Sequence, residues 1–289
     1  MNDTSDFSDF GFIGFGLIGG SIAHALREIY PSSRITAYNY HVTKKHPRLE
    51  AALADGILTD ICTNLSDMGK LDLIFLCAPV MTNVEYLKKL KPYLSENCLL
   101  TDVGSVKGNI HNEIDKLGLS HMFVGGHPMT GSEKTGYENS ASSYLKGAYY
   151  ILTPTESVPK HYTDWLADFV KAAGSHCEVL DYEQHDRITA AISHAPHIIS
   201  ASLVNTVAAM DTNGEYAKLA AGGFKDITRI SSSSPEMWQN ICLTNPDCIV
   251  SFLDEYIENL ETMKRGVLER DGDKLTEYFK QAKSYRDKL

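Results

Sequence analysis

The first half of the chain alternates short apolar runs with amphipathic segments. The apolar runs have the length of strands, and the segments between them repeat apolar residues at helical spacing. Strands separated by helices need crossover connections, and such connections build a mainly parallel sheet. The predicted strands are 10–16, 34–40, 71–79, 97–105, 121–128, 148–154 and 177–183. The predicted helices between them are 17–30, 83–94, 106–118 and 161–174.

A different pattern begins near residue 182. Residues 188–210 form a long Ala-rich stretch with helical spacing and no strand alternation. Further helices are predicted over 235–243, 246–269 and 273–288. The sequence therefore predicts an α/β domain over residues 1–178, followed by an all-helical domain over residues 179–289. The helical half carries more apolar residues than a small domain needs, which favours a homodimer formed through this domain.

A glycine motif lies at the first predicted strand-to-helix turn. Gly14, Gly16 and Gly19 have the spacing G-x-G-x-x-G, follow an apolar strand and open a helix. The first glycine makes the tight turn, the second lets a pyrophosphate approach the backbone, and the third packs helix on strand. Leu17 and Ile18 begin the helix, whose free N–H groups suit phosphates. This context predicts a Rossmann-type dinucleotide-binding domain.

The end of the second strand bears on the choice of cofactor. An acidic residue is expected there to hold the adenine ribose hydroxyls of NAD. The residue present is Asn39, which hydrogen-bonds a ribose but does not repel a 2′-phosphate. His41, Lys44 and Lys45 follow, either as contacts for such a phosphate or as a solvated turn. The sequence leaves NAD and NADP both open.

Composition and charge narrow the class of protein. The net charge of −10 argues against nucleic-acid binding, which needs a broad basic face. No apolar run approaches the length of about 20 residues that a membrane-spanning helix needs, and the polar N-terminus does not resemble a signal peptide. The six cysteines form no CxxC pair, as expected for reduced thiols. We expect a soluble cytoplasmic protein without a nucleic-acid or membrane partner.

Four short stretches carry candidate chemistry: TDVGSVKG (101–108), FVGGHPMTGSEKTG (123–136), ISHAPH (192–197) and GGFKDITRI (222–230). The first two follow strands, and ligands of open α/β sheets bind beyond the carboxyl ends of strands. Each stretch also has an ordinary structural explanation. His127 follows two glycines, interpreted as opening space for ligands, but histidines in such loops are more often surface residues. Ser105 also suits a helix cap, and Arg229 an ion pair with Asp226.

His194 and His197 raise the question of a metal site, because they lie three residues apart on one predicted helix. Two histidines do not complete a metal site, and the chain offers no convincing third and fourth ligand near them. We therefore predict no metal.

Taken together, these motifs resemble one family. The order GFGLIGGS, APV, TDVGSVK, GGHPMTGSEKTG, SHAPH, GGFKDITRI and PEMW is similar to that of the prephenate/arogenate dehydrogenases of tyrosine biosynthesis, from about residue 10 to the C-terminus. The resemblance implies a Rossmann domain followed by a helical dimerisation domain. It also implies NAD as cofactor, with NADP not excluded because Asn39 replaces the usual acid, and prephenate or its amino analogue arogenate as substrate.

The resemblance also implies roles for individual residues. His127 matches the histidine that hydrogen-bonds the substrate hydroxyl as general base, and Ser105 matches a serine beside that histidine and the nicotinamide. Arg229 matches the arginine that grips the ring carboxylate, and its planar guanidinium suits two oxygens. The remaining implied substrate contacts are His197, Lys225, Asp226, Ser132 and Glu133. The implied cofactor contacts are Gly14, Gly16, Leu17, Ile18, Gly19, Asn39, Ala78, Pro79 and Ser105.

Two alternative interpretations remain. A β-hydroxyacid dehydrogenase shares a segment like GSVK but typically uses a lysine in its helical half, and its motif does not replace GGHP and SHAPH. A catalytically silent dinucleotide sensor would keep the glycines and lose His127 or Arg229, and both are present. The sequence therefore favours oxidative decarboxylation of prephenate to 4-hydroxyphenylpyruvate with hydride transfer to NAD(P)+, with arogenate oxidation to tyrosine as the nearest alternative.

Overall fold

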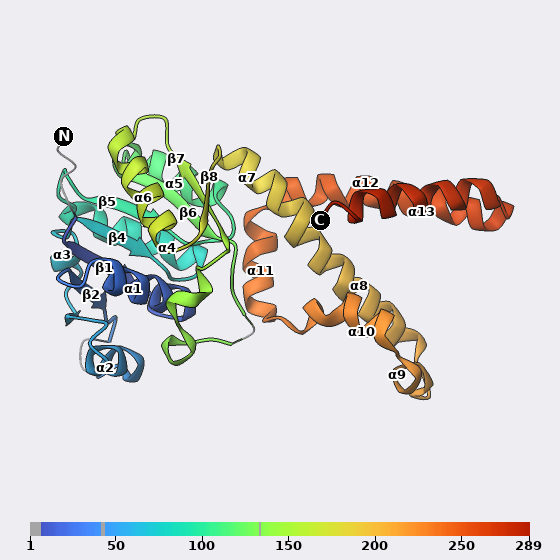
Figure 1. Cartoon of the computed structure of the whole chain (residues 1–289), viewed down its shortest axis with the longest axis horizontal. Helices are drawn as coiled ribbons and strands as arrows, with labels where there is room; N and C mark the ends of the chain where they lie inside the picture. The colour runs from blue at the N-terminus through green and yellow to red at the C-terminus, as the bar shows by residue number, and fades with distance from the viewer. Residues whose placement is uncertain (1–6, 42–43, 133) are drawn as a thin grey trace.

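The computed structural model describes residues 7–41, 44–132 and 134–289. Figure 1 shows a sheet with helices on both sides, joined by one long helical segment to a set of diverging helices. The strands are β1 (Asp9–Ile13), β2 (Arg34–Tyr38), β3 (Asp60–Cys62), β4 (Leu73–Leu76), β5 (Leu99–Asp102), β6 (Phe123–Pro128), β7 (Tyr149–Pro154) and β8 (His176–Val179). The longer helices of this part are α1 (Leu17–Ile29), α2 (Pro47–Ala54), α4 (Val80–Leu90), α5 (Gly108–Lys116) and α6 (Lys160–Ala172), with a short α3 (Leu65–Met68).

The strand order is β3-β2-β1-β4-β5-β6-β7-β8. The first six strands are parallel to one another, whereas β7 runs antiparallel to β6 and β8 runs parallel to β7. The order 3-2-1-4-5-6 is that of a dinucleotide-binding fold, whose crevice opens where the order reverses, beside β1. The prediction of a mainly parallel Rossmann-type sheet is confirmed.

The alternation along the strands produces one core on each face of the sheet. On β1, Phe10 and Phe12 belong to the core that α1 and α6 cover, and Ile13 belongs to the opposite core. Phe12 stacks on Phe75 of β4, with ring centroids 5.0 Å apart. Since side chains alternate across a strand, this pattern fixes the register and with it the positions of the turns at the carboxyl ends.

The helical part begins with one nearly continuous segment. It consists of α7 (Tyr182–Thr189), a π-helical turn (Ala190–His194) and α8 (Ala195–Met210), and it leads from the sheet to the other helices (Figure 1). The remaining helices are α9 (Glu215–Leu219), α10 (Gly222–Thr228), α11 (Pro235–Thr244), α12 (Pro246–Glu269) and α13 (Gly272–Arg286). Helix α11 begins at residue 235 as predicted, because Ser234 accepts a hydrogen bond from the Met237 N–H at 3.4 Å and Pro235 is the first helical residue.

The structure differs from the prediction in several details. The last strand ends at Val179 rather than 183, because the Asp181 carboxylate accepts the Gln184 N–H at 2.7 Å and starts α7 there. The helix predicted from residue 188 therefore begins six residues earlier, at Tyr182. Strand β3 was not predicted, since it is only three residues long and forms the edge of the sheet.

Most helices of the helical part bury few side chains. In α8 only Ala195 and Ser200 are buried. Exposed apolar side chains lie along several helices, among them Leu219, Ile227, Leu243, Leu268 and Phe279. A helix that is apolar all round and yet exposed needs a further surface to cover it. None of the helices in the described part is long and apolar enough to cross a membrane.

The requirement for glycine at position 14 can be tested by substitution. Its φ is +86°, and an added Cβ would lie 2.5 Å from the backbone N of Ala78. We predict that Gly14→Ala lowers the free energy of unfolding by at least about 1–3 kcal/mol, the cost of holding a non-glycine residue in a sparsely populated region. Gly16→Ala is the matched control, because its φ is −106° and nothing lies within 4 Å of an added Cβ. Equal stabilities of the two variants in chemical denaturation would show that the turn does not require glycine at position 14.

Candidate active site

The dinucleotide crevice is formed by the first and fourth strands of the sheet. Gly14 packs against the backbone of Ala78, so the β1–α1 and β4–α4 turns lie in contact. The amide of Asn83 fixes the second turn, accepting the Ala78 N–H at 3.1 Å and donating to the Leu76 carbonyl at 3.1 Å. Pro79 precedes α4 and leaves its first turn without a side-chain cap. The structure thus brings together the predicted cofactor residues of both turns.

The start of α1 fits a dinucleotide pyrophosphate. No side chain caps this helix at Gly16, and the space where a Cβ would stand is open there. An added Cβ at Gly19 would lie 3.0 Å from the Gly14 carbonyl oxygen and 3.2 Å from the Cys77 side chain. The helix therefore packs close to β1 while its N-terminus stays accessible. Leu17 is buried and Ile18 half-buried, so both offer backbone rather than side chain to a ligand.

Asn39 follows β2 and lies next to this turn, because Ile13 pairs with Tyr38 in the β1–β2 register. Its side chain is buried and engaged within its own loop. The amide nitrogen donates to the Lys44 carbonyl at 3.0 Å, and the amide oxygen accepts the His41 N–H at 3.0 Å. Asn39 thus stands at the carboxyl end of β2, and its side chain shapes the loop.

His127 lies in β6 and contacts a second histidine. Its Nδ1 is 2.8 Å from Nε2 of His185, and Nδ1 of His185 is 2.8 Å from Oδ1 of Asp186. Although burial opposes it, hydrogen bonds from His185 and from the backbone N–H groups of Lys107 and Gly108 lower the pKa of Asp186. Asp186 is therefore a carboxylate near neutral pH. It accepts a hydrogen bond from Nδ1–H of His185 and fixes the orientation of that ring.

This arrangement sets the tautomer of His127. When His185 is neutral and donates from Nδ1, its Nε2 is an acceptor, so the proton between the rings belongs to Nδ1 of His127. Nε2 of His127 then carries a free lone pair. Burial, and then the neighbouring His185, Lys107 and His194, lower the pKa of His127 well below its usual value. The site thus holds His127 as a neutral imidazole that accepts a proton at Nε2.

A buried ion pair supports the strand that carries His127. Lys107 is fully buried, pairs with Asp102 and donates to the Gly126 carbonyl at 2.7 Å. Asp102 also accepts the Gly126 N–H at 3.1 Å. The interpretation that the two glycines open space for ligands is wrong, because β5 and neighbouring side chains fill that space. An added Cβ at Gly126 would lie 2.6 Å from the Asp102 carbonyl, and one at Gly125 would lie 2.9 Å from Nε2 of His111.

Ser105 lies in the loop between β5 and α5. The side chain is half-buried, and its hydroxyl has no hydrogen-bond partner among the described residues. It does not cap α5, whose N-cap is Lys107 without a side-chain hydrogen bond. Instead, the Asp186 carboxylate accepts the N–H groups of Lys107 and Gly108 at 2.8 and 2.7 Å. The hydroxyl is therefore left available at the same loop that Asp186 holds.

The π-helical turn ends at a further histidine, His194. His194 is buried, and its Nδ1 lies 3.2 Å from the Asn245 amide nitrogen, which also donates to the Asp186 carbonyl at 3.0 Å. Burial lowers the pKa of His194 to about 4. Since Nδ1 accepts, Nε2 carries the proton, and this buried group has no partner among the described residues. His194 is also one of the neighbours that lower the pKa of His127.

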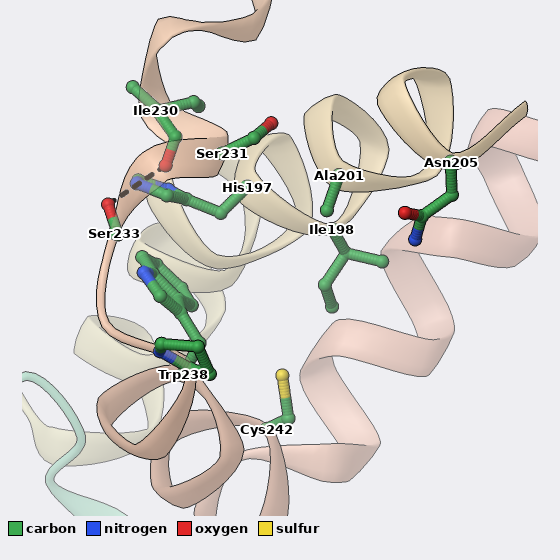
Figure 2. Close-up of a pocket in the computed structure, with 10 residues that line it drawn as sticks. His197, Ile198, Ala201, Asn205, Ile230, Ser231, Ser233, Trp238 and Cys242 are labelled. Carbon is green, nitrogen blue, oxygen red and sulfur yellow. Dashed lines mark hydrogen bonds between the residues drawn. The ribbon is translucent and has the colours of Figure 1, made fainter. Parts of the chain in front are cut away.

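His197 lines a cavity of about 360 Å³ in the helical part, shown in Figure 2. Its ring stacks on Trp238 with centroids 3.7 Å apart, and its Nδ1 donates to the Ser193 carbonyl at 2.8 Å. Burial, and then Arg229, lower the pKa of His197. Its Nε2 is therefore an acceptor in the neutral ring. Trp238 Nε1 is a buried donor without a partner among the described residues.

Arg229 begins the turn after α10 and is exposed. Buried Ser200 of α8 holds this turn, with its hydroxyl 3.0 Å from the Ile227 carbonyl and 2.7 Å from the Ser231 hydroxyl. Within the described residues Arg229 has no ion pair, so Asp226 does not neutralise it. Lys225 and Asp226 are exposed on α10 and make no such pair either.

The remaining predicted positions lie on the segment between β6 and β7. Ser132 is exposed and accepts the Lys134 N–H at 3.0 Å, with the Tyr144 hydroxyl 3.4 Å away. Glu133 lies outside the described residues. For metals, the described part of the chain contains no cluster of three or more His, Cys, Asp or Glu side chains suited to an ion.

The residues that orient the histidines were not predicted from the sequence; they are His185, Asp186, Lys107, Asp102 and Asn245. His185 and Asp186 are adjacent in the sequence, and that pairing was the available signal. Their contact with His127 spans 58 positions, so the sequence alone does not show it. Lys107 and Asp102 lie in a motif that was singled out, but nothing in it reveals that a lysine is buried.

Comparison with known proteins identifies the family. The description "Prephenate dehydrogenase, nucleotide-binding domain" matches residues 22–179, and "Prephenate dehydrogenase, dimerization domain" matches residues 181–281. The chain is 37% identical over 280 residues to the prephenate dehydrogenase of Bacillus subtilis, an alignment that covers 96% of this chain and 74% of that protein.

Solved structures agree. The A. aeolicus prephenate dehydrogenase in complex with hydroxyphenyl propionate and NAD+ superposes with a TM-score of 0.89 at 32% identity, covering 97% of this chain and 98% of that one. Synechocystis arogenate dehydrogenase gives a TM-score of 0.85 at 28% identity, covering 96% and 99%. The chain is thus an oxidoreductase with an NAD(P)-binding domain, and it belongs to the prephenate dehydrogenase family.

Proposed function

We propose that the protein converts prephenate to 4-hydroxyphenylpyruvate and CO₂ with NAD(P)+ as oxidant, and that His127 is the general base. The observation that carries the proposal is the series His127–His185–Asp186, which leaves Nε2 of a neutral imidazole free to accept a proton. Arogenate is the second candidate substrate, because its oxidation needs the same groups and the Synechocystis relative is named for it.

The proposed chemistry balances with one base and one hydride acceptor. Nε2 of His127 takes the proton of the C4 hydroxyl while the C4–H electron pair leaves as hydride. The oxidised nicotinamide, when bound, supplies the acceptor for that hydride. The bond from the ring to its carboxylate breaks, CO₂ leaves, and the bonding electrons complete the aromatic ring. The proton held by His127 returns to the phenolate oxygen.

Substrate binding needs local positive charge in a protein whose net charge is −10. We assign this role to Arg229, because it is unpaired within the described residues and its field reaches His197. A guanidinium binds both oxygens of a carboxylate. His197, Lys225, Asp226, Ser132 and Glu133 complete the proposed substrate residues, and the Ser105 hydroxyl lies ready for the reacting hydroxyl.

The proposed cofactor contacts come mainly from the β1–α1 and β4–α4 turns. The N–H groups of Leu17, Ile18 and Gly19 suit the pyrophosphate, while Gly14 and Gly16 allow its approach. Ala78 and Pro79 line the neighbouring turn, Ser105 faces the nicotinamide, and Asn39 lies at the adenine ribose.

We further propose a domain boundary between residues 178 and 179 and a homodimer through the helical part. Two observations support the dimer. Apolar side chains are exposed on the helices, and residues 181–281 match a dimerization domain. All six cysteines are free, which supports the expectation of a reducing, cytoplasmic location.

The proposal is tested by steady-state assays of prephenate and arogenate, each with NAD+ and NADP+, followed by the absorbance of the reduced nicotinamide. We expect turnover of prephenate, and a loss of about 10²–10⁴ in kcat for His127→Asn, the range for general acid–base catalysis. Absence of turnover in all four combinations would refute the proposed function. Unchanged kcat in the variant would refute only the role of His127.

His185 is a positioning residue, and its variants separate that role from a merely structural one. His185→Leu removes the acceptor for Nδ1–H of His127, so we expect kcat to fall at least tenfold with little change in KM. A tenfold fall corresponds to a rise of about 1.4 kcal/mol in the activation free energy. His185→Gln keeps an acceptor and should restore part of the rate. In the wild type, kcat/KM should hold below pH 6.5 and fall only when the lowered pKa of His127 is reached. A proportional loss of kcat in both variants with an unchanged pH profile would contradict the positioning role.

Arg229→Lys tests the substrate carboxylate site. The variant keeps the charge and loses the planar pair of donors, so KM for prephenate should rise about tenfold while KM for the cofactor stays unchanged. Arg286→Lys at the end of α13 is the control, because that arginine lies in the last turn of an exposed helix. If the cofactor KM rises instead, Arg229 belongs to the other ligand.

A further inference from the structure

The last glycine in the first turn of α1 is not explained by the dinucleotide motif. Three glycines supply the G-x-G-x-x-G spacing, and Gly20 follows the last of them. An added Cβ at Gly20 would lie 2.5 Å from Oγ of Ser140 and 3.1 Å from Cδ2 of Tyr137. Residues 137–142, on the connection between β6 and β7, therefore rest directly on the start of α1.

Two hydrogen bonds fasten this segment to α1. The Ser21 hydroxyl accepts the Ala141 N–H at 3.2 Å, and it donates to the Leu17 carbonyl at 2.8 Å. Further along the helix, the Ser142 hydroxyl donates to the Glu28 carboxylate at 2.5 Å. The segment is thus attached at two points of α1, and one of them lies in the turn that opens the helix towards the dinucleotide crevice.

Tyr137 connects this segment with the glycine turn itself. Its ring stacks on that of Phe15, the residue between Gly14 and Gly16, with centroids 5.5 Å apart and 26° between the ring planes. Phe15 also meets Phe12 of β1 edge to face, with centroids 5.5 Å apart. The Tyr137 and Phe15 side chains are only 5% and 9% exposed. The backbone of Phe15 is the middle of the turn that a pyrophosphate approaches, so the shape of the turn depends on what packs against this side chain.

Further contacts hold Tyr137 in place. Its ring lies nearly parallel to that of His24 of α1, with centroids 5.8 Å apart and 4° between the planes. Its hydroxyl donates to Oδ2 of Asp55, at the end of α2, at 2.9 Å. Burial, and then the hydrogen bond with Asp55, raise the pKa of Tyr137, so the hydroxyl stays protonated as a donor. The next residue, Glu138, pairs with Arg48 of α2 at 3.3 Å. Tyr137 is therefore fixed against two helices of the dinucleotide-binding domain.

We propose that Tyr137 is a positioning residue for the dinucleotide, and that through Phe15 it holds the β1–α1 turn in the conformation that receives the pyrophosphate. The inference rests on the proposed cofactor contacts of that turn. A glycine-rich turn has many accessible conformations, and a ligand that binds only one of them loses affinity in proportion to how rarely that one is populated. Fixing the one bulky side chain within the turn reduces this loss.

The test is a calorimetric titration of NAD+ and of NADP+ into the full-length protein without prephenate, so that binding is measured without turnover. Tyr137→Leu removes the stacked ring. We expect Kd for the preferred dinucleotide to rise about three- to tenfold, the size of one aromatic pair. Tyr137→Phe keeps the ring and loses only the hydrogen bond to Asp55, so its Kd should stay close to that of the wild type.

A second pair of variants tests the same contact from α1. Gly20→Ala places a methyl group against Ser140 and Tyr137, so it should weaken dinucleotide binding as Tyr137→Leu does. Ser140→Gly removes the two atoms that would lie nearest to that methyl group, at 2.5 and 2.7 Å. The double variant Gly20→Ala/Ser140→Gly should therefore regain affinity. If Tyr137→Leu does not fold, an unchanged Kd in Gly20→Ala overturns the proposal.

Tyr162→Leu is the matched control for loss of a buried tyrosine. Tyr162 is 7% exposed, stacks on Phe7 with centroids 5.8 Å apart and donates to the Asn97 carbonyl at 3.2 Å. This variant should lower the midpoint of thermal unfolding and leave Kd unchanged. An unchanged Kd in folded Tyr137→Leu would overturn the positioning role, and so would an equal rise of Kd in Tyr162→Leu. The expected changes in Kd without any prephenate turnover would sustain this role and refute the proposed reaction.

Discussion

The Asp186 carboxylate joins the two parts of the molecule and orients the reactive histidine. One oxygen receives Nδ1–H of His185 and the Lys107 N–H, and the other receives the Gly108 N–H. Lys107 and Gly108 belong to the loop after β5, while Asp186 belongs to the first helix of the helical part. A single anion thus fixes the loop that carries Ser105, the entry of α7 and, through His185, the ring of His127. Because a buried carboxylate is stable only with such donors, the three features depend on one another.

The surroundings of this anion determine which protonation state the histidines adopt. Lys107 brings a buried positive charge next to the cluster and is balanced by Asp102. Burial lowers the pKa of both His127 and His194, and Lys107 lowers that of His127 further, so both rings are held neutral. A neutral imidazole is the form that can take a proton from the substrate hydroxyl. The proton must return within the turnover, because burial disfavours the charged ring.

How far the sequence predicts this arrangement depends on the range of the interactions. The turn at Gly14 was predictable, because its steric demand is local and the glycine spacing records it. The SHAPH segment was recognised too, but the π-helical turn that displays His194 was not, since a helix of another period leaves no distinct pattern. The contacts of His127 with His185 and of Asn245 with Asp186 join distant parts of the chain, and only the fold brings them together. The sequence also suggested that Gly125 and Gly126 leave space for ligands. In the fold, residues of β5 and β7 occupy that space.

The helical part carries several residues of the candidate site, although its helices bury few side chains. Its helices expose apolar residues on several sides, and α8 buries only two of its residues. Yet the residues that orient the site, His185, Asp186, His194, Ser200 and Asn245, are all buried, and each is hydrogen-bonded to a neighbouring element. Order near the sheet therefore comes from polar contacts, whereas the outer helices depend on apolar surface being covered. If a second copy covers that surface, as proposed, the contact would reach α8, whose Ser200 holds the turn that carries Arg229.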